Sequence, residues 1–113
     1  MIKFTINQGN KEKEYRLAFD RESVKYAEKK KGFHFDDFGT LPVTAYSTLF
    51  NVAFYKHHGI MGEAATDEIF ASLANKSGVI QKLVEEYADV LSAFISDDED
   101  ENNNEKKVQW EIA

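Results

Sequence analysis

The sequence predicts an α+β fold, in which an N-terminal β-hairpin is followed by four helices, a mobile acidic linker and a short C-terminal strand. Apolar residues alternate at both ends of the chain, recur at helical spacing between these ends, and follow an acidic run near the C-terminus. The 113 residues are 42% hydrophobic and 13% aromatic, which suffices for one core. We therefore expect one domain over residues 1–96, a linker over 97–107 and a docking strand over 108–113.

The first two elements are expected to be strands joined by a tight turn. Alternate positions are apolar, and the positions between them are mostly polar. The apolar positions are Ile2, Phe4, Ile6, Tyr15, Leu17 and Phe19. Between the two runs, Gly9 can adopt the positive φ of a tight turn without strain. These features predict a β-hairpin.

Helical periodicity and capping residues predict the next four elements. The expected helices cover residues 21–31, 42–57, 66–75 and 77–96. Asp20, Thr66 and Ser77 have side chains that can accept hydrogen bonds from the first turn of a helix. Pro42 suits a first turn, where its missing N–H costs little.

Glycines and apolar stripes complete the description of these helices. Gly32 and Gly59 are expected to end the first and second helices. In the second helix, a broad buried stripe is expected from Val43, Tyr46, Leu49, Phe50, Ala53 and Phe54.

Composition changes abruptly after residue 96. Residues 97–101 are all acidic, so this part of the chain repels itself and has little to bury. Val108, Trp110 and Ile112 then share one face of an alternating segment, which we expect to dock as a strand. The eleven-residue linker can span about 35 Å. The strand could therefore return to its own hairpin or cross to a neighbouring copy and form a homo-oligomer.

Charge and composition exclude several classes of function. The formal net charge is −6, whereas a nucleic-acid binder needs a positive field, so we expect no nucleic-acid partner. The absence of cysteine excludes disulfides and thiolate chemistry. No apolar run approaches the ~20 residues of a membrane span, and no signal-peptide layout is present, so we expect a cytoplasmic protein without membrane contact.

The polar residues form no catalytic or metal-binding pattern. His57 and His58 are adjacent, and adjacent helical side chains point too far apart to chelate one ion. Asp36-Asp37 and the acidic run 97–101 lack the alternate spacing of a calcium loop. We therefore expect no enzyme activity, no cofactor and no metal.

Aromatic residues are the unusual feature. Phe33, Phe35 and Phe38 lie close together in a segment without regular periodicity. They could pack over the core and cover it, or they could form an apolar patch that faces a partner. Together with Val108, Trp110 and Ile112, they are the candidate partner-binding residues.

The order of short motifs along most of the chain suggests a family. The motifs are Tyr15-Arg16-Leu17-Ala18-Phe19, Leu41-Pro42, Leu49-Phe50, Ala53-Phe54, Lys56-His57-His58, Asp67-Glu68-Ile69-Phe70, Lys82-Leu83-Val84-Glu85-Glu86-Tyr87 and Val108-Gln109-Trp110. This order resembles an uncharacterised family of proteins from phages and prophages of Gram-positive hosts, which is associated with tail assembly chaperones of siphophages. The motifs consist of packing residues and carry no diagnostic chemistry.

The resemblance implies a non-enzymatic chaperone. Such a protein coats the long helical tape measure protein and recruits tail tube subunits during tail morphogenesis. It works in the host cytoplasm and is absent from the mature virion. Some phages extend a protein of this kind by a frameshift.

Three other functions remain open from the residues. A structural tail completion protein would stay in the finished particle. An acidic DNA mimic that inhibits a host protein would need carboxylates ordered on a structured face, whereas the densest ones here lie in the expected linker. An enzyme would need the histidines or Asp36-Asp37 gathered in a pocket.

Overall fold

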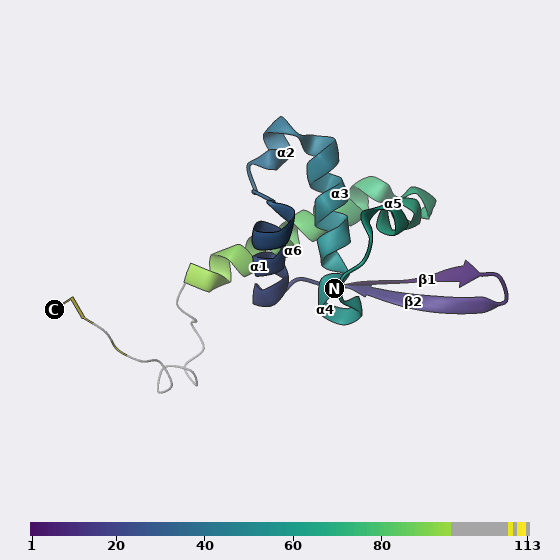
Figure 1. The fold of residues 1–113 in the computed structure, drawn as a ribbon, viewed down its shortest axis with the longest axis horizontal. Helices are drawn as coiled ribbons and strands as arrows, with labels where there is room; N and C mark the ends of the chain where they lie inside the picture. Colours follow the sequence, from purple (N-terminus) through teal and green to yellow (C-terminus); the bar gives the residue numbers. More distant parts are fainter. Residues whose placement is uncertain (96–108, 110, 113) are drawn as a thin grey trace.

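The computed structural model describes residues 1–95, 109, 111 and 112, and it has the expected α+β class with an N-terminal hairpin (Figure 1). Six helices follow the two strands within these residues, where four were expected. The elements are β1 (Ile2–Gln8), β2 (Lys11–Leu17), α1 (Arg21–Lys31), α2 (Asp37–Thr40), α3 (Pro42–Ala53), α4 (Tyr55–His58), α5 (Glu63–Ser72) and α6 (Lys76–Ile95).

The hairpin is confirmed, and its strands pair as follows. β1 and β2 pair antiparallel, with Ile2 opposite Leu17 and Phe4 opposite Tyr15. Gly9 begins the two-residue turn with a φ of 65°. Tyr15 and Leu17 are buried at the base of the hairpin, whereas the half of β2 near the turn is exposed. The turn end projects past the helices (Figure 1).

α3 is the central element of the core. It contacts α1, α2, α4, α5 and α6, and its middle and C-terminal parts are buried on most sides. The core around it is completed by residues from the hairpin, α1 and α6. Its largest members are Tyr15, Leu17, Phe19, Phe33, Leu49, Phe50, Phe54, Leu83 and Tyr87. The hairpin, α1, α3 and α6 therefore share one core, and residues of α2 and α5 pack against it.

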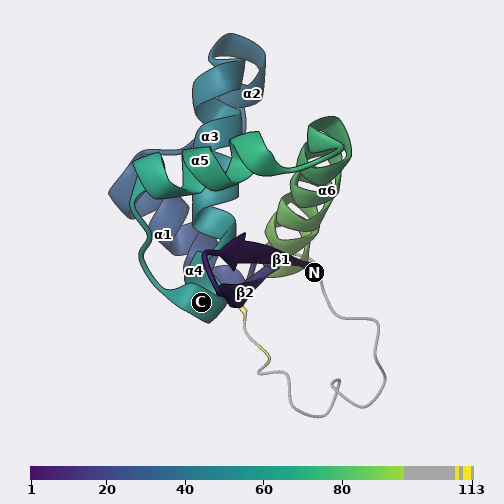
Figure 2. The ribbon, with the colours of Figure 1, turned by 90° about the vertical axis from the view of Figure 1, so that its right-hand side faces the viewer.

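The expected stripe on α3 is buried except near its N-terminus. Val43 is 82% exposed and Tyr46 is 38% exposed, so the prediction that both lie in the core was wrong. The reason is geometric: α2 and the first turn of α3 stand clear of α5 and α6 (Figures 1 and 2).

The helix expected over residues 42–57 is two helices. α3 ends at Ala53, and the short α4 begins at Tyr55. The carbonyl oxygen of Ala53 accepts a hydrogen bond of 3.1 Å from the N–H of Ala18, at the end of the hairpin. This carbonyl is the one that would bond to His57 in an uninterrupted helix, so the contact from the hairpin breaks the ladder.

Two of the predicted helix caps were wrong. α5 begins at Glu63, and Thr66 lies inside it, where its hydroxyl is 3.2 Å from the carbonyl oxygen of Glu63. α6 begins at Lys76, one residue before Ser77. Its first turn is capped by Asn75, whose Oδ1 accepts from the N–H of Gly78 at 3.3 Å.

The caps of α1 and the end of α4 were predicted correctly. Asp20 accepts from the N–H of Ser23 at 2.8 Å, and Ser23 Oγ accepts from the N–H of Asp20 at 2.7 Å, which makes a reciprocal capping box. Gly32 follows α1 in the left-handed conformation. Gly59 follows α4 with a φ of 74°.

The structure tests only part of the predictions for the C-terminal segment. Gln109, Glu111 and Ile112 belong to no strand, and Ile112 is 90% exposed. Val108, Trp110 and the expected linker over residues 97–107 lie outside the described residues. Docking of this segment therefore stays a prediction. In the described part of the chain, no helix is both long and apolar enough to cross a membrane.

Candidate apolar docking surface

The phenylalanines between α1 and α3 form an aromatic cluster on Tyr87 of α6. Phe33 is only 2% exposed and meets Tyr87 edge to face at 5.4 Å. Phe35 is 40% exposed and stacks on Tyr87 with the ring centroids 6.2 Å apart. Phe38 is half-buried and contacts both other rings. Phe33 is thus a core residue, and the accessible part of the cluster is Phe35 with Phe38.

The short helix α2 holds Phe38 in place. This segment was expected to be irregular, but it contains one helical turn. Asp37 Oδ2 accepts from the N–H of His34 at 3.1 Å, which fixes the entry to the turn. Phe38 consequently lies 5.6 Å from Tyr46 of α3, ring centroid to ring centroid. The cluster therefore continues onto α3.

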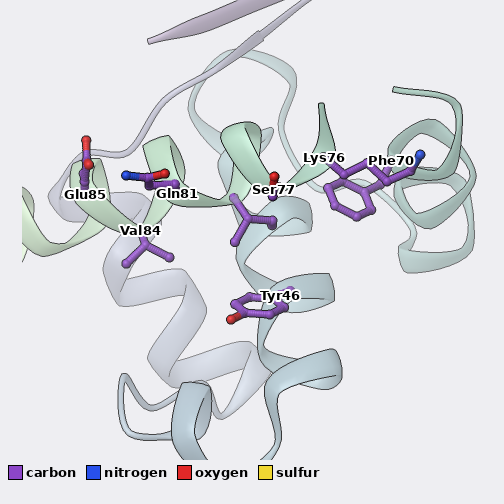
Figure 3. Close-up of a pocket in the computed structure, with 8 residues that line it drawn as sticks. Tyr46, Phe70, Lys76, Ser77, Gln81, Val84 and Glu85 are labelled. Carbon is purple, nitrogen blue, oxygen red and sulfur yellow. The ribbon is translucent and has the colours of Figure 1, made fainter. Parts of the chain in front are cut away.

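Tyr46 also lines a groove between α3, α5 and α6, which we call the aromatic groove. Its volume is about 500 Å³. Its apolar lining consists of Tyr46, Phe70, Ile80 and Val84. Its polar atoms come from Lys76, Ser77, Gln81 and Glu85. Figure 3 shows Tyr46 across from α6, which carries Ser77 and Val84. One cationic and one anionic side chain are present, so the groove selects by apolar contact more than by charge.

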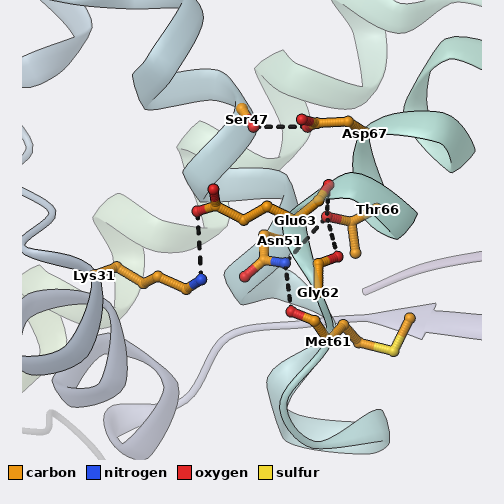
Figure 4. Close-up of polar contacts among 8 residues, drawn as sticks. All are labelled: Lys31, Ser47, Asn51, Met61, Gly62, Glu63, Thr66 and Asp67. Atoms are coloured by element: carbon orange, nitrogen blue, oxygen red, sulfur yellow. Dashed lines mark hydrogen bonds and ion pairs between the residues drawn. The ribbon is translucent and has the colours of Figure 1, made fainter.

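Polar contacts fix α5, and with it Phe70, against α3 (Figure 4). Asn51 Nδ2 donates to Thr66 Oγ1 at 3.0 Å and to the carbonyl oxygen of Met61 at 2.9 Å. Ser47 Oγ donates to Asp67 Oδ1 at 2.6 Å. Phe70 rests on Phe50 of the core, with the ring centroids 5.0 Å apart. The α5 wall of the groove is therefore held in place by contacts within the fold.

An ion pair adds a contact between α5 and α1. Lys31 Nζ lies 3.3 Å from Glu63 Oε1 (Figure 4). Both side chains are partly exposed, so the pair contributes at most about 1 kcal/mol.

Two of the candidate acids and histidines make local structural contacts. His58 Nε2 accepts from the N–H of Arg16 at 3.0 Å, and partial burial lowers the pKa of this imidazole. Asp37 is used by the α2 turn. Among the described residues, no group of three potential ligands could hold a metal ion.

Sequence reasoning missed most of the aromatic groove. Tyr46, Ile80 and Val84 have helical spacing that is typical of core residues, and each is partly exposed here. No local signal distinguishes them, because their exposure depends on how far α6 lies from α3. Of the predicted partner-binding residues, Phe35 and Phe38 lie beside the groove, and Ile112 is exposed at the C-terminus.

The fold and this surface describe a small α+β protein with an accessible apolar groove. The chain belongs to the DUF5055 family, a domain of unknown function, which matches residues 1–110. No curated protein and no solved structure matches the chain.

Proposed function

We propose that this protein is a phage tail assembly chaperone, which binds the tape measure protein and tail tube subunits without catalysing a reaction. The observation that carries the proposal is the aromatic groove of about 500 Å³, with the exposed Phe35 and the half-buried Phe38 beside it. The motif order described above supports the same function through its resemblance to phage proteins of this kind.

The groove suits an amphipathic helix. A tape measure protein presents long apolar helical stripes, and such stripes bind grooves through side chains one turn apart. Tyr46 and Phe70 provide aromatic walls from α3 and α5, and Ile80 and Val84 add apolar lining from α6. Burial of apolar area contributes about 25 cal/mol per Å², so apolar side chains of a bound helix would be stabilised in this groove.

The charge of the chaperone matters for the coated assembly. A net charge of −6 makes neighbouring copies repel each other and keeps a densely coated helix from aggregating. On this proposal, the protein acts in the host cytoplasm and leaves the tail before the virion is complete.

Co-purification tests the binding site. The tagged chain is co-expressed with the tape measure protein of the same phage, and the amount retained is compared between variants. Ile80→Glu places a charge in the groove and should abolish retention. Ile60→Glu makes the same change at a site 74% exposed, beyond the groove, and should retain the partner. Equal retention by both variants would exclude this groove.

Virion composition tests the role. Mass spectrometry of purified particles should detect the tail tube and tape measure proteins but not this chain. Its presence at a fixed copy number would instead identify a tail completion protein.

A further inference from the structure

A second groove lies between α1 and the last turns of α6, and we call it the basic groove. Its volume is about 420 Å³. Its apolar part consists of Val24, Val90, Leu91 and Phe94. Its polar part consists of Arg21, Lys25, Glu28 and Lys29. None of these residues lines the aromatic groove.

The basic groove exposes a large aromatic ring. Phe94 is 58% exposed, and the guanidinium carbon of Arg21 lies 4.8 Å from its ring centroid. A cation held over an aromatic face leaves the rest of the ring open to a second apolar group. The groove can therefore accept an aromatic side chain beside Phe94.

The rim of this groove is positive in an acidic protein. Its charged lining residues are three cations, Arg21, Lys25 and Lys29, and one anion, Glu28. The net charge of the chain is −6, so a basic rim is unusual on its surface. An acidic segment followed by apolar residues has the complementary chemistry.

The chain itself supplies such a segment directly beyond the groove. α6 ends at Ile95, one residue after Phe94, and residues 97–101 are all acidic. Val108, Trp110 and Ile112 follow on one face of the sequence. We propose that the basic groove is the docking site of this chain's own C-terminal segment, with Trp110 beside Phe94 and residues 97–101 against the basic rim.

Chain length favours docking within one molecule. Residues 96–107 separate α6 from the apolar part of the segment, and twelve residues can span at most about 40 Å, so the segment is long enough to return to the groove. A tether of this length gives an effective concentration on the order of millimolar, which exceeds the concentration of a second copy in dilute solution.

Trp110 is the single tryptophan of the chain and reports on its own docking. Fluorescence of the full-length protein is excited where tyrosine does not absorb. Wild type should show blue-shifted emission and an acrylamide quenching constant several-fold below that of free tryptophan. Emission like that of free tryptophan would overturn the proposal.

Matched variants locate the docking site. Phe94→Ala should raise the quenching constant towards the free value, whereas Phe35→Ala, which also removes a partly exposed ring, should not. Lys25→Glu with Lys29→Glu should release Trp110. The control pair Lys11→Glu with Lys56→Glu makes the same net charge change at exposed sites outside the groove and should leave it docked. If the quenching constant of Trp110 is low in wild type and unchanged in the groove variants, the segment docks elsewhere and the proposal is overturned.

Dilution of the protein distinguishes docking within one chain from docking between two copies. Quenching that is independent of dilution, with a monomeric mass by light scattering, is the expected result. Quenching that rises on dilution while the mass falls from dimer to monomer would make a second copy the occupant and refute docking within the chain. The proposal is independent of the proposed function, because neither measurement involves the tape measure protein.

Discussion

The backbone N–H of Arg16 in β2 donates a hydrogen bond of 3.0 Å to Nε2 of His58, the last residue of α4. Because Nε2 accepts, the neutral imidazole must carry its proton on Nδ1. Burial lowers the pKa of His58, and the nearby charges of His57, Lys13 and Arg16 lower it further. The hairpin and α4 are thus joined by a bond that requires a neutral histidine.

Stability should fall with acidification through His58. The unfolded chain takes up a proton near the ordinary pKa of about 6.5, and the folded chain does so only at lower pH. The stabilisation is therefore complete above pH about 6.5 and is lost as pH falls from there through the lowered pKa. Urea unfolding across this window should show it. His58→Gln should flatten the dependence, and the control His34→Gln, at an exposed site that is not among the causes of the shift, should keep it. Equal slopes for the two variants would refute the role of His58.

The phenol of Tyr87 should lose its proton only at unusually high pH. Burial, assisted by the charge of Glu28, raises the pKa of its phenol to about 12. Since the neutral form is favoured on folding, the stabilisation is present below pH about 10 and is lost as pH rises through about 12. Ultraviolet titration should show a phenolate step near pH 12 that Tyr87→Phe lacks. Coincident titration curves for the two proteins would contradict the prediction.

Asn51→Ala should destabilise the fold. Its buried amide holds the carbonyl of Met61 and the hydroxyl of Thr66, so its loss leaves buried polar groups unpaired at a cost of about 1–3 kcal/mol. Ser47→Ala removes an exposed bond between the same two helices and should cost less than about 1 kcal/mol. Chemical denaturation measures both. A loss for Ser47→Ala as large as that for Asn51→Ala would be inconsistent with this account.

Gly59 should tolerate alanine less well than Gly32. Gly32 has φ 61° and ψ 30°, a left-handed conformation that costs other residues about 1–2 kcal/mol. Gly59 has φ 74° and ψ −157°, a region that is almost restricted to glycine. Neither has an atom within 4 Å of an added Cβ, so backbone conformation alone separates them. Thermal unfolding should show a lower Tm for Gly59→Ala, and the reverse order would disprove the comparison.

The features that the sequence predicted are local ones. Alternation around Gly9 is sufficient for the hairpin, and Asp20 and Gly32 bound α1 through interactions within a few residues. The break between α3 and α4 could not be predicted, because it depends on the N–H of Ala18 reaching the carbonyl of Ala53. Thr66 shows a second limit: threonine can cap a helix or bond back inside one, and its contact with Asn51 selects the latter.

Of the candidate site, the sequence predicted only residues beside the aromatic groove and not the residues that line it. The aromatic run drew attention to Phe35 and Phe38, which border the aromatic groove. The groove itself arises where α3, α5 and α6 meet, so its lining is set by packing between distant segments. Hydrophobic periodicity identifies apolar positions, but it cannot say which of them a neighbouring helix leaves uncovered.

The projecting turn of the hairpin offers a practical handle on the protein. Gly9, Asn10 and Lys11 are exposed, and the paired strands below them fix the direction in which the turn points. Exposed turns accept insertions with little effect on the rest of a domain. A peptide epitope placed between Gly9 and Asn10 would leave both termini untagged, so wild type and every variant described above could be captured through the same turn.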